Sequence, residues 1–221
     1  IGFDSARRLG IAYNGEVEDG GSSGSIPPEA YGTNMPIMGI TFLQVPGDQP
    51  ANGGYVPMGS FMGYHDFVAP TGRPITASEY NNYMRSTWKD GQHLKNDYTV
   101  RNSPTEGRSG PDADYIYDGD PAVQTEWSEC ASGNTVADRK FILSTRDFDL
   151  ENNGVVHIAF AMVTTNADGS SGGCPFVNFD GIRNVSDTAW KVFNSLSPLS
   201  VSNIVAAKPF NIYPNPATHM L

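Results

Sequence analysis

The residues of this chain best suited to chemistry form an acidic passage near its middle. Asp112, Asp114, Asp118 and Asp120 follow one another closely, with Gly119 among them. Calcium takes about six to eight oxygen ligands from carboxylates and carbonyls in a flexible cage. The four aspartates are candidate ligands for calcium, although their spacing departs from that of the EF-hand loop. The alternative is a solvated acidic loop that holds no ion and lowers the isoelectric point.

Cysteines offer a second kind of chemistry. The chain contains two, Cys130 and Cys174, both in turn-like contexts. In an exported protein an even count of cysteines favours a disulfide. A bond that closes a loop of roughly 45 residues would stabilise the fold by about 4 kcal/mol. Two alternatives stay open, namely two buried free thiols and half of a metal site, although neither cysteine has a second Cys or His at ligand spacing.

Signals for catalysis are sparse. The four histidines, His65, His93, His157 and His219, are isolated in the sequence, and the chain contains neither a His-Glu-x-x-His pair nor a P-loop. We therefore predict no enzyme activity. A secreted hydrolase remains an alternative, because catalytic triads are defined by geometry and not by sequence order. An extracellular glycan-binding module is another, since exposed aromatic side chains can stack on sugar rings.

Composition and charge narrow the class of partner. The 221-residue chain has a net charge of −10 and a pI near 4.7, and no window is rich in Lys or Arg. These features argue against nucleic acid and anionic membrane surfaces as partners. No apolar run approaches the length of about 18 residues that a membrane-spanning helix needs. The 24 glycines and 16 prolines, with a charged fraction of 17%, indicate short strands joined by many turns.

Hydrophobic periodicity predicts a mainly β fold. Residues 37–45 alternate loosely, and residues 139–145 read as a second strand. The best strand candidate covers residues 155–164, where apolar residues on both faces predict a central strand covered on both sides. The Asn153-Gly154 pair before it predicts a hairpin turn. We therefore expect an antiparallel β-sandwich or a β-rich α+β domain.

One or two short helices are expected to pack against the sheets. Thr76 and Glu79 fit a capping box, and apolar side chains recur after them at helical spacing. This pattern predicts a helix over residues 76–89. A second helix is expected over residues 187–195, with Asp187 as its N-cap candidate.

The end of the chain carries its most specific signal. Alternating apolar residues, Phe210 and Ile212, precede the hexapeptide Tyr213-Pro214-Asn215-Pro216-Ala217-Thr218. The segment resembles the opening of the type A C-terminal sorting domain, which Bacteroidota attach to proteins exported by the type IX secretion system. The resemblance implies a secreted or outer-membrane-attached protein, and a partner in the translocon or the attachment machinery. The alternative is an ordinary Pro-Asn-Pro turn with the same stiffness.

Scattered patches extend the resemblance over most of residues 1–195. They include Arg8-Leu9-Gly10-Ile11-Ala12-Tyr13, Trp127-Ser128-Glu129-Cys130 and Asp138-Arg139-Lys140-Phe141-Ile142-Leu143-Ser144. Together they are similar to the C-terminal half of large secreted Bacteroidota proteins that end in the same sorting signal. The resemblance implies export and a β-rich fold, and it carries over no catalytic residue.

These patterns predict three parts and a role outside the cell. Residues 1–194 would form the β-rich module, 195–208 a linker, and 209–221 the first strand of a sorting domain that continues past Leu221. The first residues lack the basic start and the apolar core of a signal peptide. Because the sorting-domain resemblance implies export, a signal peptide is expected upstream. The predicted function is that of a secreted cell-surface structural or adhesive protein. The disulfide and calcium would stiffen it, and its partners would be surface proteins or glycans.

Overall fold

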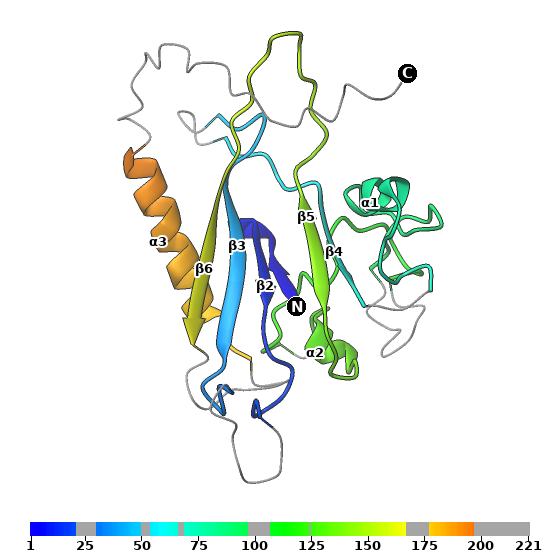
Figure 1. The fold of residues 1–221 in the computed structure, drawn as a ribbon, viewed down its shortest axis with the longest axis vertical. Helices are drawn as coiled ribbons and strands as arrows, with labels where there is room; N and C mark the ends of the chain where they lie inside the picture. The colour runs from blue at the N-terminus through cyan, green and yellow to red at the C-terminus, as the bar shows by residue number, and fades with distance from the viewer. Residues whose placement is uncertain are drawn as a thin grey trace, which may run out of the picture.

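The computed structural model describes residues 1–20, 30–49, 54–65, 69–96, 107–123, 125–166 and 177–196. Six strands, one 3-10 helix and three α-helices lie within these ranges (Figure 1). In chain order they are β1 (Gly2–Asp4), η1 (Ser5–Arg7), β2 (Leu9–Ala12), β3 (Pro36–Gln44), β4 (Ser60–Tyr64), α1 (Ala77–Tyr83), α2 (Glu129–Ser132), β5 (Lys140–Ser144), β6 (Ala159–Asn166) and α3 (Asp180–Leu196).

The larger sheet has the strand order β1-β2-β3-β6, and every neighbouring pair is antiparallel. A single helical turn, η1, reverses the chain between β1 and β2. The Asp4 carboxylate caps it by accepting the Arg7 amide, and Arg8 leaves it with φ of 52°, in the left-handed region. This tight reversal sets Asp4 opposite Leu9 in the sheet.

The smaller sheet pairs β4 with β5 in antiparallel register. An extended segment around Tyr115 lies along the other side of β4. There the Phe61 amide donates to the Asp114 carbonyl at 3.1 Å, and the Ile116 amide donates to the Phe61 carbonyl at 2.9 Å. The β4 backbone is therefore bonded on both sides.

Two core clusters hold the layers together. Between the sheets, the Phe61 ring lies 5.0 Å from Phe3 and 5.1 Å from Phe141, measured between ring centroids. Gly10 permits this approach, because a Cβ there would lie 2.9 Å from Phe141. The second cluster fills the space between the larger sheet and α3, and it includes Leu9, Ile11, Ile37, Val163 and Ile182. Figure 1 shows α3 and the β4–β5 pair on different sides of this sheet.

The structure confirms the coarser fold prediction, antiparallel sheets with a few helices. Strand β3 coincides with the predicted strand over residues 37–45, and β5 with the one over 139–145. The capping box is present: the Glu79 amide donates to Thr76 Oγ1 at 3.2 Å, and the Thr76 amide donates to Glu79 Oε2 at 3.0 Å. Helix α1 nevertheless ends at Tyr83, well before residue 89.

The prediction for the second helix was wrong at its start. Helix α3 begins at Asp180, where the side-chain oxygen of Asn178 accepts the Asp180 amide at 2.8 Å. Asp187 is therefore not an N-cap but lies inside the helix, where it binds Arg7. The helix also runs to Leu196, so two residues of the predicted linker are helical.

The prediction of a hairpin ending in a central strand was also wrong. The turn itself forms, with Asn153 at φ of 64° and the Gly154 amide donating to the Glu151 carbonyl. However, β5 and β6 belong to different sheets, because the connecting segment crosses from one to the other. Among the described residues β6 pairs on one side only, with β3, and its Phe160 and Met162 side chains are 58% and 69% exposed.

Candidate functional site

Two aspartates of the acidic passage are bound by cations from distant parts of the chain. Asp112 accepts a hydrogen bond from the Lys95 ammonium at 2.5 Å. This bond and the charge of Lys95 hold the pKa of Asp112 below its usual range. Asp120 accepts a hydrogen bond from the Arg183 guanidinium of α3 at 2.8 Å. Both carboxylates therefore serve ion pairs that tie segments together.

The other two aspartates do not join them in one cage. Asp114 lies 3.9 Å from the Arg146 guanidinium, and Asp118 is exposed. Within the described ranges, no group of three or more His, Cys, Asp or Glu side chains is placed to hold a metal ion. The predicted calcium cage of Asp112, Asp114, Asp118 and Asp120 is therefore not assembled. The reason is local, since residues around Tyr115 run extended along β4 instead of folding around an ion.

The predicted disulfide can be described on one side only. Cys130 lies in α2 and is 8% exposed, and the Tyr13 hydroxyl is 3.5 Å from its sulfur. No cysteine among the described residues is a free thiol. Cys174 lies outside the described residues, so the pairing of Cys130 with Cys174 stays a prediction.

The sorting signal falls wholly outside the described residues, which end at Leu196. This applies to Phe210, Ile212, Tyr213, Pro214, Asn215, Pro216, Ala217 and Thr218. Its role in export therefore stays a prediction.

A buried ionic cluster at α2 is a feature that no pattern in the sequence indicated. The Glu129 carboxylate binds Arg139 and the Ile1 nitrogen, and Arg139 also contacts His65 and donates to the Thr135 carbonyl at 2.7 Å. Burial acts to raise the pKa of Glu129. The positive charge and the hydrogen bond of Arg139 act to lower this pKa and so oppose the effect of burial. The cluster joins segments far apart in the sequence.

Beside this cluster lies an open cleft of about 800 Å³. Tyr13, Cys130 and Arg139 are among its lining residues, together with the segment 133–139. Burial raises the pKa of Tyr13 strongly, which keeps its phenol protonated. Glu129 and Arg139, two of the charged residues that line the cleft, are paired with each other. We therefore assign this part of the cleft a structural role, fixing α2 against the start of the chain.

The tryptophans bear on the glycan alternative. Trp88 and Trp127 are 1% and 4% exposed, so both are core residues. Trp190 of α3 meets Tyr55 edge-to-face, with an interplanar angle of 89°. Both rings flank the Arg8 guanidinium, at 5.3 Å for Tyr55 and 5.7 Å for Trp190. These described tryptophans stabilise the core and an arginine, and they do not form a flat stacking platform.

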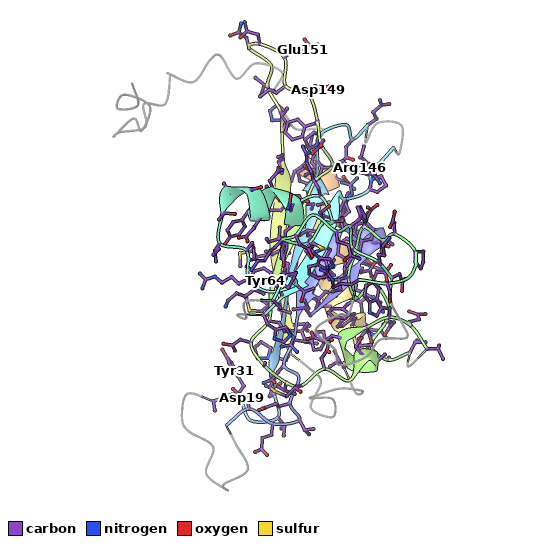
Figure 2. All side chains as sticks on the ribbon, turned by 90° about the vertical axis from the view of Figure 1, so that its right-hand side faces the viewer. Asp19, Tyr31, Tyr64, Arg146, Asp149 and Glu151 are labelled. Carbon is purple, nitrogen blue, oxygen red and sulfur yellow. The ribbon has the colours of Figure 1, made fainter. Side chains whose placement is uncertain are left out.

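The segment between β5 and β6, residues 145–158, projects from the body of the molecule and is here called the projecting loop. Figure 2 shows Asp149 and Glu151 at its far end. Four large apolar side chains on it are exposed, among them Leu150 at 59% and Val155 at 77%; the others are Phe148 and Ile158. Such solvent-exposed apolar side chains are available to a partner.

Hydrogen bonds and ion pairs anchor the projecting loop at its base. The Gly59 amide donates to the Ser144 carbonyl at 2.8 Å, just before the loop begins. Asp147 pairs with Arg85 at 3.0 Å. Farther out, acidic residues alternate with apolar ones: Phe148 follows Asp147, and Leu150 lies between Asp149 and Glu151. The loop is thus an anchored, amphipathic projection.

A partly exposed apolar face of the larger sheet follows the loop in the chain. Antiparallel register places Phe42 opposite Phe160, with ring centroids 6.1 Å apart, and Ile40 opposite Met162. These side chains point away from α3, which covers the other face of the same strands. The projecting loop and this face together are the candidate interaction surface of the chain.

Comparison with known protein families, curated proteins and solved structures finds no match to this chain. Within the described ranges, no helix combines the length and the apolar character that crossing a bilayer requires. What the chain does must therefore be argued from its own residues.

Proposed function

We propose that this chain is a non-catalytic, secreted cell-surface module with a structural or adhesive role. The observation that carries the proposal is the projecting loop, with exposed apolar side chains at Phe148, Leu150 and Val155. A chain gains no folding stability from apolar side chains held in water, whereas a partner that buries them gains the hydrophobic free energy. A loop that is anchored at its base and carries exposed apolar side chains farther out suits such a contact.

The chemistry of the loop defines the kind of partner. Apolar residues alternate with Asp147, Asp149 and Glu151, and the whole chain carries a net charge of −10. A complementary surface has an apolar pocket surrounded by basic residues. We propose a protein surface of this kind as the partner. The two sheets would act as the layers of a β-sandwich, a rigid support that holds the loop out.

Export through the type IX secretion system is the second part of the proposal. It rests on the resemblance of Tyr213-Pro214-Asn215-Pro216-Ala217-Thr218 to the opening of a sorting domain. The translocon or the attachment machinery would bind this segment, and the module of residues 1–194 would remain on the cell surface.

The adhesive role is tested in cells that lack the protein and are complemented with its full-length gene. We expect the double variant Phe148→Ser/Leu150→Ser to reach the surface in normal amount but to lose adhesion. The matched control is Val17→Ser/Ile75→Ser, which removes two exposed apolar side chains outside the loop, 64% and 74% exposed. Adhesion that survives the loop variant, or fails equally in the control, would contradict the proposed contact.

Export is tested separately by replacing Pro214 and Pro216 with Ala in the full-length protein. Both replacements remove the fixed φ of the turn and leave the module of residues 1–194 unaltered. We expect the protein to disappear from the cell surface while the intracellular amount is maintained or rises. Unchanged surface display would remove the sorting role of this segment but would leave the adhesive role to be judged by the loop variants.

A further inference from the structure

The free edge of the larger sheet differs sharply from its other edge. Strand β6 pairs only with β3 among the described residues, and it presents an eight-residue edge. The opposite edge, β1, has three residues, and its Phe3 amide donates to the Tyr117 carbonyl at 3.1 Å. Long unpaired edges are templates for pairing with another strand.

The β6 edge lacks the charged side chains and the proline that keep many edge strands monomeric. Proteins protect such edges with charged side chains, proline or a short length. Residues 155–166 contain no Lys, Arg, Asp, Glu or Pro, and the facing residues 36–44 of β3 contain no charged side chain. In a chain with a net charge of −10, this is an uncharged surface on which two copies can approach without direct repulsion.

Apolar side chains flank this edge on the open face of the sheet. Phe160 and Met162 of β6 are 58% and 69% exposed, and Ile158 just before the strand is half exposed. Because they lie on the edge strand itself, a strand added beside β6 would place its own side chains against them.

The helix α3 provides a second apolar flank, on the opposite face. Val185, Val192 and Leu196 are spaced by seven and four residues, so they share one side of the helix. Gly181 lies on the same side, and a Cβ there would lie 3.3 Å from Thr165 of β6. Val192 and Leu196 are more than half exposed.

The other side of α3 is hydrogen-bonded to the body of the molecule. Arg183 donates to Asp4 at 2.9 Å, and the Trp190 indole donates to Thr41 Oγ1 at 3.2 Å. Since these bonds point toward the β1–β2 end of the sheet, the side with Val192 and Leu196 faces the β6 edge. The edge is thus apolar on both faces of the sheet.

We propose that β6 pairs with β6 of a second copy of this chain, antiparallel and about a two-fold axis. The pairing joins two four-stranded sheets into one continuous sheet, with the two α3 helices side by side over the join. The contact is isologous, so each surface meets its own copy. It involves neither the tip of the projecting loop nor the sorting segment, and it stands independently of the proposed adhesive role.

A second copy fits this edge better than an isolated strand from another protein. An added strand alone would cover Phe160 and Met162 but would leave Val192 and Leu196 of α3 in water. A second copy presents an edge strand and an adjacent apolar helix stripe at the same spacing, because it is the same structure. Self-complementarity therefore covers both flanks of the edge at once.

The test is the solution mass of the full chain, measured by sedimentation equilibrium or light scattering. At about 100 μM, where even weak specific association is visible, we expect twice the chain mass of 23.8 kDa. Met162→Lys places two like charges near the two-fold axis and should raise the dimer dissociation constant at least about tenfold, since like charges at a contact repel. The matched control Met84→Lys adds the same charge at an exposed site at the end of α1, which lies away from β6 in Figure 1, and should leave the dimer intact.

A second variant tests the helix flank separately. Val192→Lys leaves β6 unaltered but charges the α3 stripe, and it should also weaken the dimer about tenfold, for the same electrostatic reason. Unchanged melting temperatures would show that each variant folds. A monomeric wild-type chain, or a dimer that tolerates Met162→Lys, would overturn the proposal. Dissociation by Met162→Lys with no effect of Val192→Lys would overturn the two-fold arrangement and indicate that a bare strand binds the edge.

Discussion

Arg8 and Asp48 form a buried bidentate ion pair, with Nη1–Oδ2 and Nη2–Oδ1 distances of 2.7 and 2.6 Å. Their side chains are 4% and 1% exposed. The Asp48 carboxylate also accepts the backbone amides of Val45 and Val56, at 2.9 and 2.7 Å. The pair therefore fixes the loop after β3 onto the turn between β1 and β2, at the base of the larger sheet.

Replacing Asp48 with Asn should destabilise the fold strongly. The change leaves the Arg8 guanidinium buried without its counter-charge, and breaking a buried pair in this way costs about 3–5 kcal/mol. Urea unfolding at neutral pH measures the loss. The matched control is Asp147→Asn, which breaks an exposed pair with Arg85 and should change the free energy of unfolding by less than about 1 kcal/mol. Equal effects of the two variants would contradict the structural role given to Asp48.

The same carboxylate predicts a pH dependence of stability. Burial acts to raise the pKa of Asp48, but the hydrogen bonds from Arg8, Val45 and Val56 lower it further, so the net pKa in the folded state is depressed. The unfolded chain then binds the proton more readily, with an aspartate pKa of about 3.9. Stability from this group is complete above that pH and is lost as the pH falls through the lower, folded pKa.

The measurement compares the wild type with Asp48→Asn in urea unfolding across the acidic range. The stability difference between them should be constant from neutral pH to about 4 and should shrink below it. A difference that is the same at about pH 3 and pH 7 would show that the Asp48 carboxylate is not the group that titrates.

Local signals in the sequence were sufficient where one segment decides its own structure. The capping box at Thr76 and Glu79 predicted where α1 begins, because capping depends on residues within one turn. Helix α3 shows the limit of such signals. Asp187 has the side chain of an N-cap, but it binds Arg7, a partner 180 positions away. The sequence contains no local sign of that pairing, so the predicted helix started too late.

Strand β6 shows why the candidate surface was harder to predict. Apolar residues on both faces of residues 155–164 indicated a strand covered on both sides. The sequence pattern of this strand indicates that both of its faces are apolar, but it does not indicate what covers them. In the structure α3 covers one face, while Phe160 and Met162 on the other are exposed. A strand face that a partner molecule buries and one that lies in the protein's own core have the same apolar pattern in a sequence.

The calcium hypothesis for the acidic passage, residues 112–120, failed for a related reason. Four aspartates close in sequence indicated a shared ion, yet Asp112 and Asp120 are bound by Lys95 and Arg183. Those cations come from segments whose positions only the tertiary fold determines. Clustering along the chain therefore overestimated clustering in space.

The N-cap of α1 gives a third prediction. Thr76→Ala removes the hydroxyl that accepts the Glu79 amide, and losses of this kind typically cost about 1 kcal/mol. Hydrogen exchange at the amides of residues 77–83 should accelerate, and global stability should fall by a similar amount. The control is Ser78→Ala, an exposed residue in the same turn that is not the cap. An equal effect at Ser78 would mean that helix propensity, and not capping, was measured.

The predicted disulfide between Cys130 and Cys174 gives the last prediction. If the bond forms, replacing either cysteine with Ala breaks it, and unfolding under non-reducing conditions should lose about 2–4 kcal/mol. The double variant should be little worse than either single variant, because two residues that share one bond are strongly non-additive. Intact mass after alkylation provides the direct check: the wild type should take up the reagent only after reduction.

The single variants also distinguish the stability that comes from the disulfide from the stability that comes from packing of the Cys130 side chain. Cys130 is buried beside Tyr13, so its replacement also removes packed atoms whether or not a bond exists. Replacing Cys174 is the discriminating change. A loss of stability for Cys174→Ala close to that for Cys130→Ala supports the pairing, since the shared bond then dominates both. Full stability of Cys174→Ala, with alkylation of the unreduced wild type at both thiols, would rule the disulfide out and remove the main sequence argument for an oxidising compartment.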